Sequence, residues 1–196
     1  MLKDLMVSKV RVKLLQTFLY QPDEIFYVRQ LVRKINEEIN AVRRELARME
    51  RANMVKKEQR GNRLYYYFNR DYALYEDLLS MVHKTVGLGR EIIKNKSKLG
   101  RIKLVMFSGR FARRLPLEEG GVDLLLVGDI NMQLLAKLVR TEEARLKREI
   151  NYTVMTKDEF NFRKKRRDPF LQGILLGSRI MIISDQEDLV TKYGEG

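Results

Sequence analysis

Amide and guanidinium groups gather in residues 38–51 of this chain. If the segment is helical, Asn40, Arg44 and Arg48 lie four residues apart and line one face. Asparagine amides and arginine forks match the hydrogen-bonding edges that bases present in the major groove of DNA. The spacing therefore predicts a helix that reads base pairs.

An apolar stripe on the same segment predicts how this helix is held. Ile39, Val42, Leu46 and Met49 recur at helical spacing, so one face can pack while another presents polar groups. The alternative interpretation is a solvated helix whose arginines form ion pairs within the segment. Its possible partners are Glu38, Glu45 and Glu50.

Further elements are predicted around this helix. Apolar residues recur at helical spacing in residues 8–20 and again in 25–35, with short polar breaks between the helices. Residues 54–59 and 64–68 have the composition of two strands. Between them, Gly61 and Asn62 tolerate the backbone of a tight hairpin turn.

This order of elements, and the run INAVRRELARMERANMVKKEQRGNRLYYYF within it, resembles the winged helix-turn-helix domain of arsenical-repressor-type transcriptional regulators over residues 8–68. The resemblance implies double-stranded DNA as partner, a base-reading surface on the third helix and a wing that contacts phosphates or the minor groove. The implied base-reading residues are Asn40, Ala41, Arg43, Arg44 and Arg48, and the wing residues are Arg60, Asn62 and Arg63.

Composition and charge favour a polyanionic partner. The net charge is +13 and the pI about 9.9. Residues 1–100 hold 21 Lys and Arg against 12 Asp and Glu, a net +9, whereas 101–196 hold 18 against 14, a net +4. The absence of cysteine excludes thiolate chemistry, and a single histidine disfavours a histidine metal site. We expect a cytoplasmic protein without cofactor, metal or membrane contact.

Residues 71–98 are predicted to form one long helix, weakened near Gly87 and Gly89. Its apolar stripe is either buried or shared with a second chain, and pairing would place two recognition helices on adjacent half-sites of a homodimer. His83 is expected to be packed or solvent-facing. The stripe comprises Tyr75, Leu78, Leu79, Val82, Val86 and Ile93.

The second half of the chain predicts a small sheet with helices. Four apolar runs have strand character, and helices are expected over residues 132–147 and from Thr156 onward. The runs are 102–107, 122–127, 150–155 and 180–183. The fold class is α+β. The predicted domains are a DNA-binding domain (1–70), a long linker or dimerisation helix (71–99), a C-terminal small mixed α/β domain (100–184) and a tail (185–196).

Residues 102–184, with the segments VMFSGRFARRLPLEEGGVDLLLVGD and EINYTVMTKDEFNFRKKRRDPFLQGIL, are similar to the minimal nucleotidyltransferase domain. The resemblance implies a Gly-Ser pair for nucleotide phosphates and three carboxylates for magnesium. Here the pair is reversed as Ser108-Gly109. Gly121 and Asn151 stand where two carboxylates belong, and Asp123 is retained. We therefore expect a domain that keeps the fold without nucleotidyl transfer.

Two further features have open roles. A vestigial nucleotide pocket is predicted at Ser108, Gly109, Arg110 and Asp123, although use of the domain as a scaffold or protein-interaction module is favoured. The run RKKRR at 163–167 is either a solvated face or a salt-sensitive contact with DNA backbone.

The leading hypothesis is a homodimeric, sequence-specific transcriptional regulator with a catalytically degenerate nucleotidyltransferase-like domain. The alternative is an active nucleotidyltransferase that modifies a protein or RNA, with Asp129 or Glu149 completing the site of Asp123. A third hypothesis is RNA binding through the tyrosines at 65–67, but a strand alternates its faces, so at least one of them belongs to the core.

Overall fold

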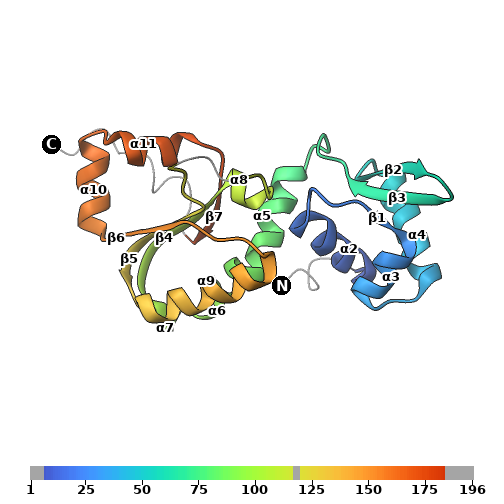
Figure 1. Cartoon of the computed structure of the whole chain (residues 1–196), viewed down its shortest axis with the longest axis horizontal. Coiled ribbons are helices and arrows are strands. Elements are labelled where there is room, and N and C mark those ends of the chain that lie inside the picture. The colour runs from blue at the N-terminus through green and yellow to red at the C-terminus, as the bar shows by residue number, and fades with distance from the viewer. Residues whose placement is uncertain (1–6, 117–119, 184–196) are drawn as a thin grey trace. The chain divides into compact units, whose positions relative to one another are not determined.

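The structure is a computed structural model that describes residues 7–116 and 120–183, and these contain ten helices and two sheets. The chain divides into two compact units, Met1–Thr85 (unit 1) and Val86–Gly196 (unit 2) (Figure 1). The predicted α+β class is confirmed. The predicted tail, 185–196, lies outside the described residues. None of the helices in these residues has the length and hydrophobicity of a transmembrane span.

Three helices of unit 1 appear where apolar spacing predicts them. They are α2 (Lys9–Tyr20), α3 (Val28–Ile35) and α4 (Ile39–Arg51). The Ser8 hydroxyl caps α2 by accepting from the backbone N–H of Arg11 at 3.2 Å. Asn36 ends α3 in the left-handed conformation (φ 50°), which asparagine tolerates, and so turns the chain toward α4.

The second helix is three residues shorter than predicted, because residues 26–27 belong to a sheet. Strand β1 (Phe26–Tyr27) pairs antiparallel with β3 (Arg63–Phe68), which also pairs with β2 (Val55–Arg60). The Phe26 ring is buried edge-on to Phe18, with centroids 5.8 Å apart, and this packing favours the strand. The predicted hairpin turn is present, with Gly61 at φ 55°.

The prediction of one long helix over 71–98 is wrong. The segment forms α5 (Tyr75–Thr85), α6 (Gly87–Lys94) and α7 (Lys96–Leu99). Gly87 takes φ 65°, which breaks the helix at little steric cost because glycine lacks a Cβ. The apolar stripe of α5 is buried inside unit 1, where α5 packs on α2. His83 is packed as well, 1% exposed and with its ring 5.6 Å from that of Tyr20.

Unit 2 is built on a mixed sheet of four strands, as predicted. The strands are β4 (Gly100–Ser108), β5 (Leu124–Ile130), β6 (Tyr152–Met155) and β7 (Arg179–Ile183). Their order is β6-β5-β4-β7, with β5 and β6 parallel and the other pairs antiparallel. The helices that follow α7 are α8 (Gly109–Ala112), α9 (Met132–Leu146), α10 (Lys157–Lys165) and α11 (Pro169–Leu176).

The core of unit 2 is closed on one side by α10 and α11. It gathers residues of all four strands and, from these two helices, Phe160 and Leu171. The Thr156 hydroxyl caps α10 by accepting from the backbone N–H of Glu159 at 3.1 Å. The position of α10 is therefore fixed by a cap at its start and a buried phenylalanine in its second turn.

One carboxylate of α9 is buried in unit 2. Glu142 is 4% exposed, and its Oε1 lies 2.7 Å from Nη2 of Arg145 and 3.9 Å from Nη2 of Arg114. Burial raises the pKa of Glu142 from 4.5 to about 7, against the opposing effects of the Arg114 guanidinium and the backbone N–H of Leu88 in α6. The carboxyl group thus links α9 to the start of α6.

Glu142→Gln should make the stability of unit 2 less dependent on pH. Because the folded-state pKa is raised, the wild-type chain loses stability as pH rises from about 4.5 to about 7, and the variant does not share this loss. The difference between the two chains should change by about 3 kcal/mol between pH 4.5 and 7.5. Urea unfolding followed by circular dichroism measures it. Glu149→Gln, at an exposed position of the same unit, is the control. Parallel pH profiles for wild type and Glu142→Gln would contradict the prediction.

Candidate functional site

Helix α4 divides into a buried and an exposed face. Val42, Leu46 and Met49 are fully buried, in agreement with the predicted stripe. Ala41 is half-buried. Of the residues predicted to contact DNA, those exposed on α4 are Asn40, Arg43, Arg44 and Arg48, and those exposed on the hairpin are Arg60, Asn62 and Arg63.

Glu45 anchors α4 to α2. Its carboxylate is 3% exposed, accepts a hydrogen bond from the Ser8 hydroxyl at 3.0 Å and pairs with Nε of Arg11 at 2.5 Å. Arg48 lies 3.6 Å from the same carboxylate while remaining exposed. The buried charge therefore holds α4 in place and takes up part of the charge of Arg48.

The other two glutamates of the segment are also engaged. Glu38 accepts from two backbone N–H groups in the first turn of α4, both at 2.8 Å, and these bonds lower its pKa. Glu50 pairs with Nζ of Lys57 on β2 at 2.7 Å. No carboxylate in the described part of the chain forms an ion pair with Arg43 or Arg44. After the two backbone N–H groups, the charges of Arg44 and Arg43 also lower the pKa of Glu38. The predicted ion pairing within the segment therefore occurs between Arg48 and Glu45, while Arg43 and Arg44 interact with Glu38 only at longer range.

The guanidinium groups of the hairpin lie over tyrosine rings. Arg60 pairs with Glu58 at 2.8 Å, and its guanidinium carbon is 5.9 Å from the centre of the Tyr65 ring. That of Arg63 is 4.9 Å from the centre of the Tyr27 ring on β1. These contacts restrain two long side chains near the turn without covering them.

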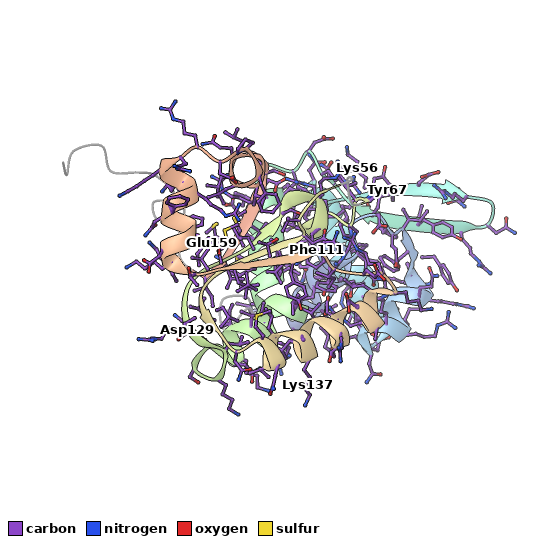
Figure 2. The ribbon with its side chains drawn as sticks, turned by 60° about the vertical axis from the view of Figure 1, so that its left-hand side comes forward. Lys56, Tyr67, Phe111, Asp129, Lys137 and Glu159 are labelled. Atoms are coloured by element: carbon purple, nitrogen blue, oxygen red, sulfur yellow. The ribbon has the colours of Figure 1, made fainter. Side chains whose placement is uncertain are left out.

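The three consecutive tyrosines of β3 alternate as a strand requires. Tyr66 is buried, and Tyr65 and Tyr67 are half-buried. The prediction that at least one belongs to the core is confirmed. Tyr67 stands opposite Lys56 of β2, and the two are labelled on the hairpin in Figure 2.

Unit 2 contains a cavity of about 490 Å³ at the predicted vestigial pocket. Ser108, Gly109 and Arg110 line it, whereas Asp123 does not. Much of the remaining wall is apolar, with Phe170 and Ile174 from α11. The structure thus brings together three of the four predicted pocket residues.

Asp123 forms a buried ion pair. It is fully buried, and both of its carboxylate oxygens lie 2.8 Å from Nη2 of Arg148. The backbone N–H of Asn151 donates to the same carboxylate at 3.2 Å, and Arg148 also donates to the carbonyl of Leu115 at 3.1 Å. A positively charged side chain therefore neutralises the carboxylate that the resemblance assigns to a metal ion.

Three residues of the cavity wall, Ser108, Gly109 and Arg110, already have hydrogen-bond partners in the protein. The backbone N–H of Gly109 donates to the carbonyl of Ser178 at 2.6 Å. A Cβ at Gly109 would meet the Ser178 hydroxyl at 1.9 Å, so this close approach requires glycine. The Ser108 hydroxyl caps α8, and Arg110 donates twice to the carbonyl of Pro116, at 3.1 and 2.9 Å.

The carboxylates considered as substitutes lie on the surface. Asp129 forms an exposed pair with Arg101 at 3.4 Å, and Glu149 is exposed. In residues 7–116 and 120–183 no group of three acidic, histidine or cysteine side chains could hold a metal ion. Arg148 was not foreseen from the sequence, because nothing local marks a contact between residues 25 positions apart.

Comparisons with known proteins give little. No protein-family model matches the chain, and no curated protein matches it. Among solved structures, that of reduced HlyU from Vibrio cholerae N16961 is similar over 42% of this chain and 82% of that one, with 18% identity and a TM-score of 0.35. A likeness of this size assigns neither fold nor function.

Arg148→Met should strongly destabilise unit 2, because it leaves the buried Asp123 carboxylate without its cation. The expected loss is about 3–5 kcal/mol, and adding Asp123→Asn should recover most of it. Urea unfolding of the two variants measures both effects. Arg101→Met, which breaks the exposed pair with Asp129, is the control and should cost less than about 1 kcal/mol. If Arg148→Met costs no more than the control, the pair has no structural role.

Proposed function

We propose that unit 1 is a winged helix-turn-helix module that binds double-stranded DNA, and that the chain is a sequence-specific transcriptional regulator. The observation that carries this proposal is the state of Arg43 and Arg44. Both are exposed, and neither has a carboxylate partner among the described residues, although three glutamates lie in or beside the same helix. Two exposed guanidinium groups outside any ion pair, on a packed helix, suit a ligand that brings its own negative charge.

The geometry of α4 supports reading of base edges. An α-helix fits the major groove, where Arg binds guanine and Asn binds adenine through paired hydrogen bonds. Asn40 and Arg44 lie one turn apart on the exposed side of α4, and the Glu45 anchor keeps that side outward. On the hairpin, Arg63 and Asn62 suit phosphates, whereas Arg60 is partly compensated by Glu58.

For unit 2 we propose a scaffold or interaction role without nucleotidyl transfer. The ion pair between Asp123 and Arg148 supports this, because a neutralised, buried carboxylate is a poor ligand for magnesium. The bond from Gly109 to Ser178 supports it too, since it occupies an N–H that would otherwise face a phosphate. The homodimer stays a prediction, and the stripe of α5 on which it rested is part of the unit 1 core.

Arg43→Ala and Arg44→Ala should each weaken binding to the preferred DNA site by about 1–3 kcal/mol if the side chains reach base edges. The site is first obtained by selecting bound duplexes from random DNA at a stated salt concentration. Affinities for that site and for a scrambled duplex are then measured by fluorescence anisotropy. Arg140→Ala, which removes an exposed cation from α9 of unit 2, controls for net charge.

The possible outcomes separate the roles of these arginines. A loss confined to the selected site supports base reading. Equal losses on the selected and scrambled duplexes would make Arg43 and Arg44 phosphate contacts. Selection that enriches no sequence would reject the regulator.

Incubation of the full chain with labelled nucleoside triphosphates, magnesium and candidate protein or RNA acceptors should give no label transfer. The physical reason is the neutralisation of Asp123 by Arg148. Asp123→Asn serves as the control for any background signal. Label transfer that disappears in this variant would establish the enzymatic alternative.

A further inference from the structure

The basic run of α10 contains one arginine with an internal role. Arg163 pairs through Nε with Glu159 at 2.9 Å and through Nη1 with Asp168 at 3.5 Å. Asp168 in turn caps α11 by accepting from the backbone N–H of Leu171 at 3.0 Å. Arg163 therefore links α10 to the cap of α11 through Asp168, while its pair with Glu159 lies within α10.

The last three cations of the run have no such role. Lys165, Arg166 and Arg167 are exposed, and none forms an ion pair with another described residue. Arg167 takes the left-handed conformation (φ 54°) in the turn that ends α10. Three positive charges thus stand together where the helix ends and the chain turns into α11.

An aromatic ring lies among these charges. Phe162 is 58% exposed, and the guanidinium carbon of Arg166 is 4.9 Å from the centre of its ring. Phe160, two residues earlier, is 1% exposed in the core, so α10 is well packed and still leaves Phe162 outside. A surface hollow of about 590 Å³ runs beside the ring, with Arg166 and Pro169 in its wall. Figure 2 shows α10, on which Glu159 is labelled.

We propose that this surface, the α10 corner (Phe162, Lys165, Arg166 and Arg167), binds single-stranded nucleic acid. A base stacks on Phe162 in place of or beside the Arg166 guanidinium, and the backbone phosphates lie at the three cations. Exposed aromatic rings interleaved with positive charge are the usual means of binding single strands without sequence preference. This site is separate from α4 and does not depend on DNA binding by unit 1.

The side chains favour a single strand over a duplex. Stacking on a phenylalanine needs a base whose face is accessible, and in a duplex the faces are covered by neighbouring pairs. A surface for duplex backbone alone would need the three cations but not the ring. The exposed ring of Phe162 is therefore the feature that selects the ligand.

An anionic membrane is the other polyanion to consider. Helices that lie in a membrane interface bury a continuous apolar face. On α10 the apolar side chains are Phe160 and Phe162, and Phe160 is occupied in the core of unit 2. The other exposed apolar side chains of this part of unit 2, Phe170 and Leu176, lie on α11, at 42% and 80% exposure. α10 itself therefore presents one ring and no continuous apolar face for such insertion, so nucleic acid fits the surface better.

The ring is tested with the full chain and labelled oligothymidylate of about 12 nucleotides, within the usual site size. Phe162→Ala should lower affinity by about 5- to 100-fold, measured by fluorescence anisotropy. Phe162→Leu, which keeps apolar bulk without an aromatic face, should lose affinity similarly, and Phe162→Trp should retain it. Leu176→Ala removes a side chain that is 80% exposed in the same unit and is the matched control.

The charges are tested by the salt dependence of the same binding. Replacing Lys165, Arg166 and Arg167 together by Gln should reduce the slope of log affinity against log salt by about 2, because each phosphate contact on a single strand contributes about 0.7. Phe162→Ala should leave the slope unchanged. The matched control replaces Lys137, Arg140 and Lys147 together by Gln. These are exposed cations of α9 and its C-terminal cap, and Lys147, like Arg167, has a left-handed backbone conformation.

Three results would overturn the proposal. The first is that Phe162→Ala binds the oligonucleotide with wild-type affinity. The second is that Phe162→Ala loses as much affinity for an abasic oligonucleotide of the same length, which has no base to stack, as it loses for oligothymidylate. The third is Phe162-dependent binding to phosphatidylserine vesicles without binding to the oligonucleotide. Arg43→Ala combined with Arg44→Ala should leave single-strand binding intact, while Phe162→Ala should leave duplex binding intact, so failure of this proposal is distinguishable from failure of the one for unit 1.

Discussion

Buried carboxylates need cations, and this requirement commits three arginines of the chain to ion pairs. In the described chain three carboxylates are almost fully buried, and each is met by an arginine: Glu45 by Arg11, Asp123 by Arg148 and Glu142 by Arg145. A buried charge without a partner would cost several kcal/mol, so these arginines are committed to the fold. With a net charge of +13, many other cations cannot find a carboxylate. On the exposed face of α4 such cations lie beside the amide of Asn40, and at the α10 corner they lie beside the ring of Phe162.

Much of the fold could be predicted because its signals are local. Apolar spacing and a serine cap predict helix α2, and a turn conformation that Gly61 can adopt predicts the hairpin. Strand β1 could not be predicted, because it exists only through pairing of Phe26 with Tyr66, forty residues away. The break at Gly87 was visible as a weak point, but a glycine costs a helix only about 1 kcal/mol, so tertiary packing decides whether the helix continues.

For the candidate sites too, the sequence predicts what depends on local pattern and does not predict what depends on long-range contacts. The exposure of Arg43 and Arg44 follows from the amphipathic pattern of one helix, which the sequence contains in full. That neither arginine forms an ion pair does not follow from this pattern, because it depends on the pairing of Glu45 and Glu50 with cations of other elements. The sequence likewise suggested a lost metal site at Asp123. That Arg148 pairs with this carboxylate required knowing which residues meet across the unit.

The two proposed surfaces are complementary to different parts of a nucleic acid. On α4, unpaired guanidinium groups stand beside the amide of Asn40, and hydrogen-bonding groups of this kind are complementary to base edges. At the α10 corner, unpaired cations surround an aromatic ring, which is complementary to a base face. A duplex exposes edges and hides faces, whereas a single strand exposes both. Under the two proposals, the groups beside the exposed cations, rather than the cations themselves, therefore set the strand state that each surface binds.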